Sequence, residues 1–161
     1  MKVLLAGIGN VFLGDDGFGV EVARRLHGVP LPDGVTVADF GIRGVHLAYE
    51  LLDGYDAAVL VDALPRGGPP GTVYVFEPGS EVGTAPAAGP VLDAHAMTPD
   101  AVLALLRTLG GTLGRVIVVG CEPADVGEGM GLSAPVAAAV DRAAAEALAV
   151  ARDLVTDNGK G

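Results

Sequence analysis

Short apolar runs and stretches of helical spacing alternate along this chain from the first residues to the last. Runs with the length of strands occupy 3–6, 35–38, 57–61, 72–76 and 116–119. Helical spacing of apolar residues predicts helices at 18–26, 45–52, 98–109 and 136–155. The run at 57–61 contains no polar residue, which is typical of a strand buried on both faces of a sheet.

The alternation of strands and helices predicts an α/β fold with a mostly parallel sheet of about five strands. One strand is an exception to the parallel arrangement. The turn at 65–71 is too short for a parallel return, so the strand at 72–76 should run antiparallel to the strand before it. We expect one domain over 1–161, with a disordered tail at 157–161.

Charge and cysteine content narrow the range of partners. The formal net charge is −10 and the chain has no Lys/Arg cluster, which excludes nucleic acid and favours metal ions or basic peptides. The single cysteine, Cys121, excludes an internal disulfide and a thiolate zinc cluster. No apolar segment approaches the roughly 18 residues of a membrane helix. We therefore expect a soluble cytoplasmic protein that does not bind membranes.

A glycine-rich turn at 7–19 follows the first strand and precedes the first helix, a position that often binds phosphate. Two adjacent carboxylates, Asp15 and Asp16, occupy this turn, and their charge repels phosphate and attracts a cation. The dinucleotide fingerprint also fails, because Phe12 stands where its third glycine should be. A nucleotide enzyme of the Rossmann type is therefore the weaker interpretation. We expect Asp15 to cap the following helix and Asp16 to be a ligand.

Acidic residues also follow the second and third predicted strands. These are Asp39 and Asp62, and ligands of parallel sheets bind at the carboxyl ends of the strands. If the first strand neighbours the third, Asp16 and Asp62 approach each other, and two carboxylates that close need a cation or a proton between them. An Asx turn before Pro65 is the alternative role of Asp62.

One of the three histidines, His95, stands immediately before a capped helix, and the start of that helix should anchor it. Together with Asp16 and Asp62 it completes a set of two carboxylates and one imidazole. Such a set suits zinc, nickel or iron with open positions for a further ligand. A solvated loop histidine is the alternative role of His95. We expect His27 to be a cation at a helix end. His46 should lie early in the second predicted helix, in solvent or with a local hydrogen bond.

Cys121 suggests a rival chemistry, a Cys/His pair for nucleophilic catalysis. The cysteine follows an apolar strand, and the acids Glu122 and Asp125 nearby would raise its pKa. A small buried hydrophobic residue is therefore the better interpretation of Cys121.

Several segments of the chain combine into a known pattern. They are Gly7-Ile8-Gly9-Asn10, Gly14-Asp15-Asp16-Gly17, Asp39-Phe40-Gly41, Val61-Asp62-Ala63, the His95 loop, Gly120-Cys121-Glu122-Pro123 and Gly131-Leu132-Ser133. In this combination the chain resembles the hydrogenase maturation protease family, from about residue 2 to residue 155. Members of that family are endopeptidases that remove the carboxyl-terminal extension from the large subunit of nickel-iron hydrogenases after nickel insertion.

The resemblance implies a three-layer sandwich, with a twisted sheet between helices on both faces. It implies a catalytic and nickel-sensing site at Asp16, Asp62 and His95, and a role in substrate positioning for Asp39. It also implies that the precursor supplies the nickel, and that zinc or another divalent ion can take its place. No organic cofactor is implied. The expected partner is the nickel-loaded large-subunit precursor. A non-catalytic maturation chaperone that binds nickel or the precursor is the alternative function.

Overall fold

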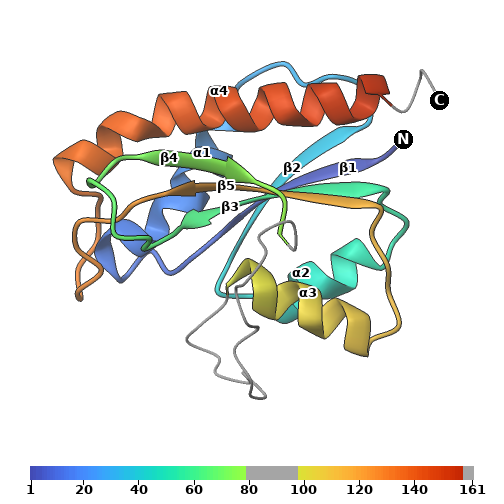
Figure 1. The fold of residues 1–161 in the computed structure, drawn as a ribbon, viewed down its shortest axis with the longest axis horizontal. Coiled ribbons are helices and arrows are strands. Elements are labelled where there is room, and N and C mark those ends of the chain that lie inside the picture. Colours follow the sequence, from blue (N-terminus) through green and yellow to red (C-terminus); the bar gives the residue numbers. More distant parts are fainter. Residues whose placement is uncertain (79–97, 158–161) are drawn as a thin grey trace.

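The computed structural model describes residues 1–78 and 98–157. Their strands form a five-stranded sheet in the order β2-β1-β3-β5-β4 (Figure 1). The strands are β1 (Val3–Ile8), β2 (Val35–Gly41), β3 (Ala57–Ala63), β4 (Val73–Phe76) and β5 (Arg115–Cys121). β1 pairs in parallel with β2 and β3, β3 pairs in parallel with β5, and β4 pairs antiparallel with β5. The predicted α/β fold with a mostly parallel sheet is confirmed.

Two strands are longer than the apolar runs that predicted them. β2 continues past Ala38 to Gly41, and β3 includes Asp62. Main-chain pairing extends both strands, because Asp39 lies opposite Gly7 of β1 and Asp62 lies opposite Gly120 of β5. The edge strand β4 runs antiparallel to β3 as predicted, but β5 lies between them.

The helices form two layers, one on each face of the sheet. They are the 3-10 turn η1 (Gly14–Gly17) and the α-helices α1 (Phe18–Leu26), α2 (Gly44–Leu51), α3 (Pro99–Thr108) and α4 (Ala134–Asp157). α1 and α4 pack on one face, and α2 and α3 pack on the other (Figure 1). The three-layer sandwich is therefore confirmed. None of the helices in the described part of the chain has the length and apolar character needed to cross a membrane.

Local sequence features predict where α3 begins, but not where α4 ends. α3 begins as predicted, because the Thr98 Oγ1 accepts a hydrogen bond from the Ala101 N–H at 3.2 Å and Pro99 follows the cap. α4 continues to Asp157, so the prediction of a disordered tail from 157 is wrong for this residue. Residues 158–161 of that tail lie outside the described residues.

Alternation along the strands divides the core into two clusters. In β1, Leu5 belongs to the cluster under α1 and α4, whereas Leu4 belongs to the cluster under α2 and α3. In β3, Val61 packs with the first cluster and Leu60 with the second. Every residue of β3 is buried, as its uninterrupted apolar run predicted. The same alternation places Asp62 on the α2 and α3 side of the sheet.

A close crossing of α1 over β1 positions the loop between them. Gly7 and Gly19 lie at this crossing, and a Cβ on either residue would overlap main-chain atoms of the other segment. The crossing holds η1 over the carboxyl end of β1. From β1 the chain moves to β2 on one side, and it later enters β3 on the other side. Ligands of open α/β sheets bind at such a switch point, between the carboxyl ends of the two strands.

Candidate functional site

Asp62 is a buried carboxylate at the carboxyl end of the central strand β3. Its side chain is 4% exposed. Among the described residues, its only hydrogen bond comes from the neighbouring Ala63 N–H, 2.8 Å from Oδ1. Burial and then the charge of Asp16 raise the pKa of Asp62 well above its ordinary value of 3.8, and the Ala63 N–H offsets this only in part. The site thus contains a buried acid that has few donors to stabilise its charge.

Asp16 faces this buried acid from η1. It is half-buried, and its Oδ2 accepts a hydrogen bond from the Asn10 N–H at 2.8 Å. Gly9 lies between the two acids with a φ of 134°, and a Cβ there would lie 3.5 Å from the Asp62 Oδ1 and overlap the Asp16 main chain. Only glycine leaves this space free. The structure therefore brings Asp16 and Asp62 together, as the pairing of β1 with β3 requires.

Asp39 lies one strand away from the two acids. It is inside β2 and opposite Gly7 of β1, so the prediction that it follows the strand is wrong. Alternation places Asp39 on the α1 and α4 face with Val37, whereas Asp62 lies on the other face. Among the described residues, no hydrogen bond joins Asp39 to Asp16 or Asp62.

The predicted third ligand, His95, lies in 79–97, outside the described residues. Within 1–78 and 98–157, no group of three or more His, Cys, Asp or Glu side chains is placed to hold a metal ion. Asp16 and Asp62 are two of the three predicted ligands, and they are the two that the described residues include. Carboxylate oxygens and an imidazole are suitable donors for nickel or zinc.

Asp15 does not cap a helix, which corrects the expectation from sequence. The N-cap of α1 is Gly17, and neither η1 nor α1 has a side-chain cap. The Asp15 carboxylate is fully buried and accepts four hydrogen bonds: from the N–H groups of Ala124 at 2.8 Å, Asp125 at 2.9 Å and Ser133 at 2.7 Å, and from the Ser133 Oγ at 2.8 Å. Burial raises the pKa of Asp15, but these donors outweigh it, so the pKa falls below 3.8.

The Asp15 bonds join η1 to the loop between β5 and α4. The partners of Asp15 are more than 100 residues away in sequence. No local pattern identifies such an acid, because its donors belong to a distant segment. Asp15 and Asp16 are adjacent, yet Asp15 fixes the loops, whereas Asp16 faces Asp62 at the carboxyl end of β3.

Glu122 is a buried acid outside the set of predicted site residues. It follows β5, and its Oε1 accepts hydrogen bonds from the Arg66 N–H at 2.8 Å, the Gly68 N–H at 2.9 Å and the Tyr74 hydroxyl at 2.9 Å. Burial raises the pKa of Glu122, but the hydrogen-bond donors outweigh burial, so the pKa falls below its ordinary value of 4.5. Glu122 therefore holds the 65–71 turn against the end of β5. Its position after a buried strand is the same sequence feature that selected Asp62.

Cys121 is fully buried at the end of β5. Burial, together with the charges of Asp15 and Glu122, raises the pKa of its thiol from 9.0 to about 11. The Sγ lies 3.7 Å from the main-chain oxygen of Glu122. A pKa raised in this way disfavours the reactive thiolate, in agreement with the interpretation as a small buried hydrophobic residue.

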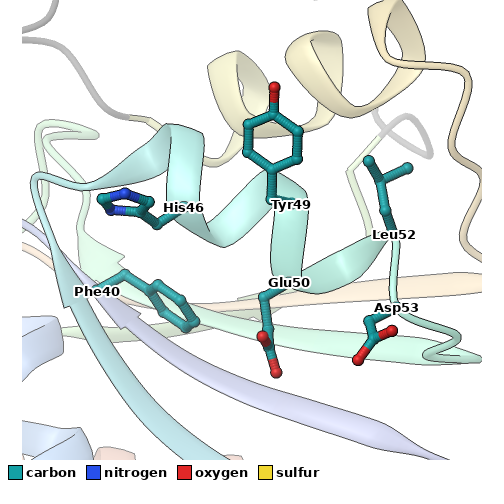
Figure 2. A pocket seen from close by; sticks show the side chains of 6 residues that line it. All are labelled: Phe40, His46, Tyr49, Glu50, Leu52 and Asp53. Atoms are coloured by element: carbon teal, nitrogen blue, oxygen red, sulfur yellow. The ribbon is translucent and has the colours of Figure 1, made fainter.

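The remaining two histidines lie away from the two acids. His27 is the C-cap residue of α1, as expected, and His46 is exposed on α2. A pocket of about 440 Å3 lies beside α2 and is lined by Phe40, His46, Tyr49, Glu50, Leu52 and Asp53 (Figure 2). His46 lies at one end of this pocket and Asp53 at the other (Figure 2). The Glu50 Oε1 accepts a hydrogen bond from the Tyr55 hydroxyl at 2.9 Å, so this carboxylate is already hydrogen-bonded within the protein.

Known proteins resemble this chain over most of its length. The family model HycI, described as Hydrogenase maturation protease, matches residues 20–150. The hydrogenase expression/formation protein HupD of Rhizobium leguminosarum bv. viciae is 32% identical over 153 residues, which are 94% of this chain and 74% of HupD. Hydrogenase 2 maturation protease of Escherichia coli K12 is 28% identical, over 95% of this chain and 92% of that protease.

Solved structures agree with these sequences. The hydrogenase maturating endopeptidase HybD from Escherichia coli superposes with a TM-score of 0.74 at 27% identity, over 95% of this chain and 93% of HybD. The NiFe hydrogenase maturation protease HybD from Thermococcus kodakarensis superposes with a TM-score of 0.70 at 28% identity, over 94% of this chain and 99% of that protein. The chain belongs to the hydrogenase maturation protease family.

Proposed function

We propose that this protein is an endopeptidase that removes the carboxyl-terminal extension of a nickel-iron hydrogenase large-subunit precursor after nickel insertion. The observation that carries the proposal is the approach of Asp16 to Asp62 at the carboxyl ends of β1 and β3. Family membership makes a hydrogenase precursor the substrate class. Recognition of the bound nickel by Asp16, Asp62 and His95 is the further step of the proposal.

The electrostatics of the pair favour a cation. Asp62 is buried next to a second carboxylate, so its charged form lacks stabilisation until a positive charge arrives. The nickel in a precursor supplies that charge. An empty precursor does not supply it. Recognition of the metal thus makes cleavage conditional on nickel insertion, without any separate sensor.

The chemistry requires a polarised carbonyl and an activated water. Nickel held at the precursor polarises the scissile carbonyl or the attacking water. A carboxylate of the pair acts as the base that removes a proton from this water. The water oxygen bonds to the carbonyl carbon, the C–N bond breaks, and the proton passes to the leaving amine. Asp39, one strand away at the same edge of the sheet, positions the substrate chain.

Mass spectrometry of the large subunit tests this function. Purified protein is mixed with nickel-loaded and with nickel-free precursor, and we expect release of a carboxyl-terminal peptide from the nickel-loaded form alone, over many turnovers. His95→Ala should stop this release while His27→Ala, at the end of α1, leaves it unchanged. Equal cleavage of both precursors contradicts nickel recognition, and normal cleavage by His95→Ala removes His95 from the site. Tight binding without peptide release identifies a binding chaperone in place of an enzyme.

A further inference from the structure

Two loops next to Asp16 are joined into one surface. The Gly129 N–H donates to the Phe12 oxygen at 2.9 Å, and the Gly14 N–H donates to the Gly129 oxygen at 2.8 Å. Leu13 and Gly129 also form a parallel bridge. The four hydrogen bonds of the Asp15 carboxylate fix the same pair of loops from the inside. The loops at 10–14 and 124–131 therefore have a defined arrangement before any partner binds.

Large apolar side chains project from this surface into solvent. Phe12 is 64% exposed, Val126 is 50% exposed and Met130 is 75% exposed. Single exposed apolar residues are ordinary, but three on two short joined loops form a patch, and such patches mark interaction sites. Folding does not explain them, because neither the core under α1 and α4 nor the core under α2 and α3 includes them.

A groove continues from this patch between the loops and the helices α1 and α4. Its volume is about 620 Å3, and Val11, Met130, Leu132 and Val140 contribute its apolar lining. The two arginines of the groove are paired with acids: Arg24 lies 2.9 Å from Glu21, and Arg25 lies 2.8 Å from Asp141. A partner of this groove therefore meets apolar side chains between neutralised charges.

The charge on the loops is acidic throughout. Residues 7–17 and 121–133 contain five acids, Asp15, Asp16, Glu122, Asp125 and Glu128, and no lysine or arginine. Asp15 and Glu122 are buried, whereas Asp125 and Glu128 are exposed beside Val126. A second copy of this chain, with its net charge of −10, is a poor match for such a surface. A polypeptide segment with apolar and basic side chains is a good match.

We propose that the patch of Phe12, Val126 and Met130 docks a segment of the precursor polypeptide that carries apolar and basic side chains. This inference rests on the proposed function. Phe12 lies in the same loop as Asn10, whose main-chain N–H donates a hydrogen bond to the Asp16 Oδ2, so a chain docked on the patch lies near Asp16. Because Asp15 already fixes the loops, little ordering of the protein opposes binding. The patch thus adds affinity for the polypeptide to the recognition of its nickel.

Binding of nickel-free precursor tests the patch separately from cleavage. Its dissociation constant is measured by calorimetry for the wild type and for the double variant Phe12→Ala, Met130→Ala. We expect at least a tenfold weaker affinity for the double variant, because exposed apolar anchors contribute much of such binding energy. Unchanged affinity overturns the proposal. The peptide release described above tests the enzyme independently, so failure of one experiment does not decide the other.

Two matched pairs of single variants guard against misfolding. Val126→Ala should weaken binding, whereas Val29→Ala, an exposed valine after α1, should not. Glu128→Lys should weaken binding and reduce its salt dependence, whereas Asp153→Lys on α4 should not. Equal effects within either pair overturn the proposal. Sedimentation of the wild type alone completes the test, because a dimer that Val126→Ala dissociates would assign the patch to a second copy of the chain.

Discussion

Two neighbouring strands, β3 and β5, each deliver a buried carboxylate to the same edge of the sheet, and the two carboxylates behave in opposite ways. Asp62 is 4% exposed and Glu122 is 5% exposed. Asp62 lies opposite Gly120, only two residues before Glu122. The pKa of Asp62 is raised by burial and by Asp16, whereas hydrogen-bond donors outweigh burial and lower the pKa of Glu122.

The difference comes from the donors. Glu122 accepts three hydrogen bonds from the 65–71 turn and β4, and Asp15 accepts four from the loop before α4. Asp62 accepts one among the described residues, and it faces another acid. Burial alone therefore does not distinguish a functional acid from a structural one. A buried acid with satisfied oxygens holds the fold, and one with open oxygens can bind a cation.

The largest effect is expected for Asp62→Asn. The amide keeps an oxygen for the Ala63 N–H but neither binds a cation as a carboxylate does nor accepts a proton from water. Release of the carboxyl-terminal peptide should fall by about 100-fold or more. The urea midpoint should stay the same or rise, since a poorly stabilised buried acid is removed. Peptide release at the wild-type rate would contradict the assignment of Asp62.

Asp15→Asn should show the opposite result, a loss of stability. An asparagine at this position offers one acceptor oxygen to the four donors from Ala124, Asp125 and Ser133, and its amide group faces the others. We expect the free energy of unfolding to fall by about 2–4 kcal/mol, measured by urea denaturation. Asp125→Asn, an exposed neighbour in the same loop, is the control. A loss no larger than that of the control would mean that Asp15 does not hold the loops.

Glu122→Gln should have the smallest effect, one that depends on pH. The folded pKa of Glu122 lies below its ordinary value of 4.5, so its stabilisation is complete above that value and is lost as the pH falls through the folded pKa. The variant lacks this contribution at every pH. The gap between the urea midpoints of wild type and variant should be widest at neutral pH and narrow below about pH 4.5. A constant gap, or one matched by the exposed-acid variant Glu128→Gln, would contradict this role.

The sequence by itself determined the order of strands and helices, the antiparallel direction of β4 and the edge of the sheet where the acids lie. Apolar runs, helix caps and a short turn at 65–71 are local, and parallel strands place their carboxyl ends together. The family resemblance also followed from motifs in the sequence. Asp16 and Asp62 approach each other because β1 neighbours β3 in the sheet. From the sequence, this pairing of strands was only a condition of the prediction.

Only the tertiary structure separated Asp15 and Glu122, whose oxygens accept several hydrogen bonds, from the candidate site acid Asp62. Asp15 and Asp16 have the same side chain and adjacent positions, and the partners of Asp15 lie more than 100 residues away. Glu122 and Asp62 both follow apolar runs, and the donors that distinguish them come from Arg66, Gly68 and Tyr74. A pattern along the chain predicts the strand or loop in which an acid lies. The packing of distant main-chain N–H groups decides whether its oxygens are already satisfied, and so whether a cation can bind there.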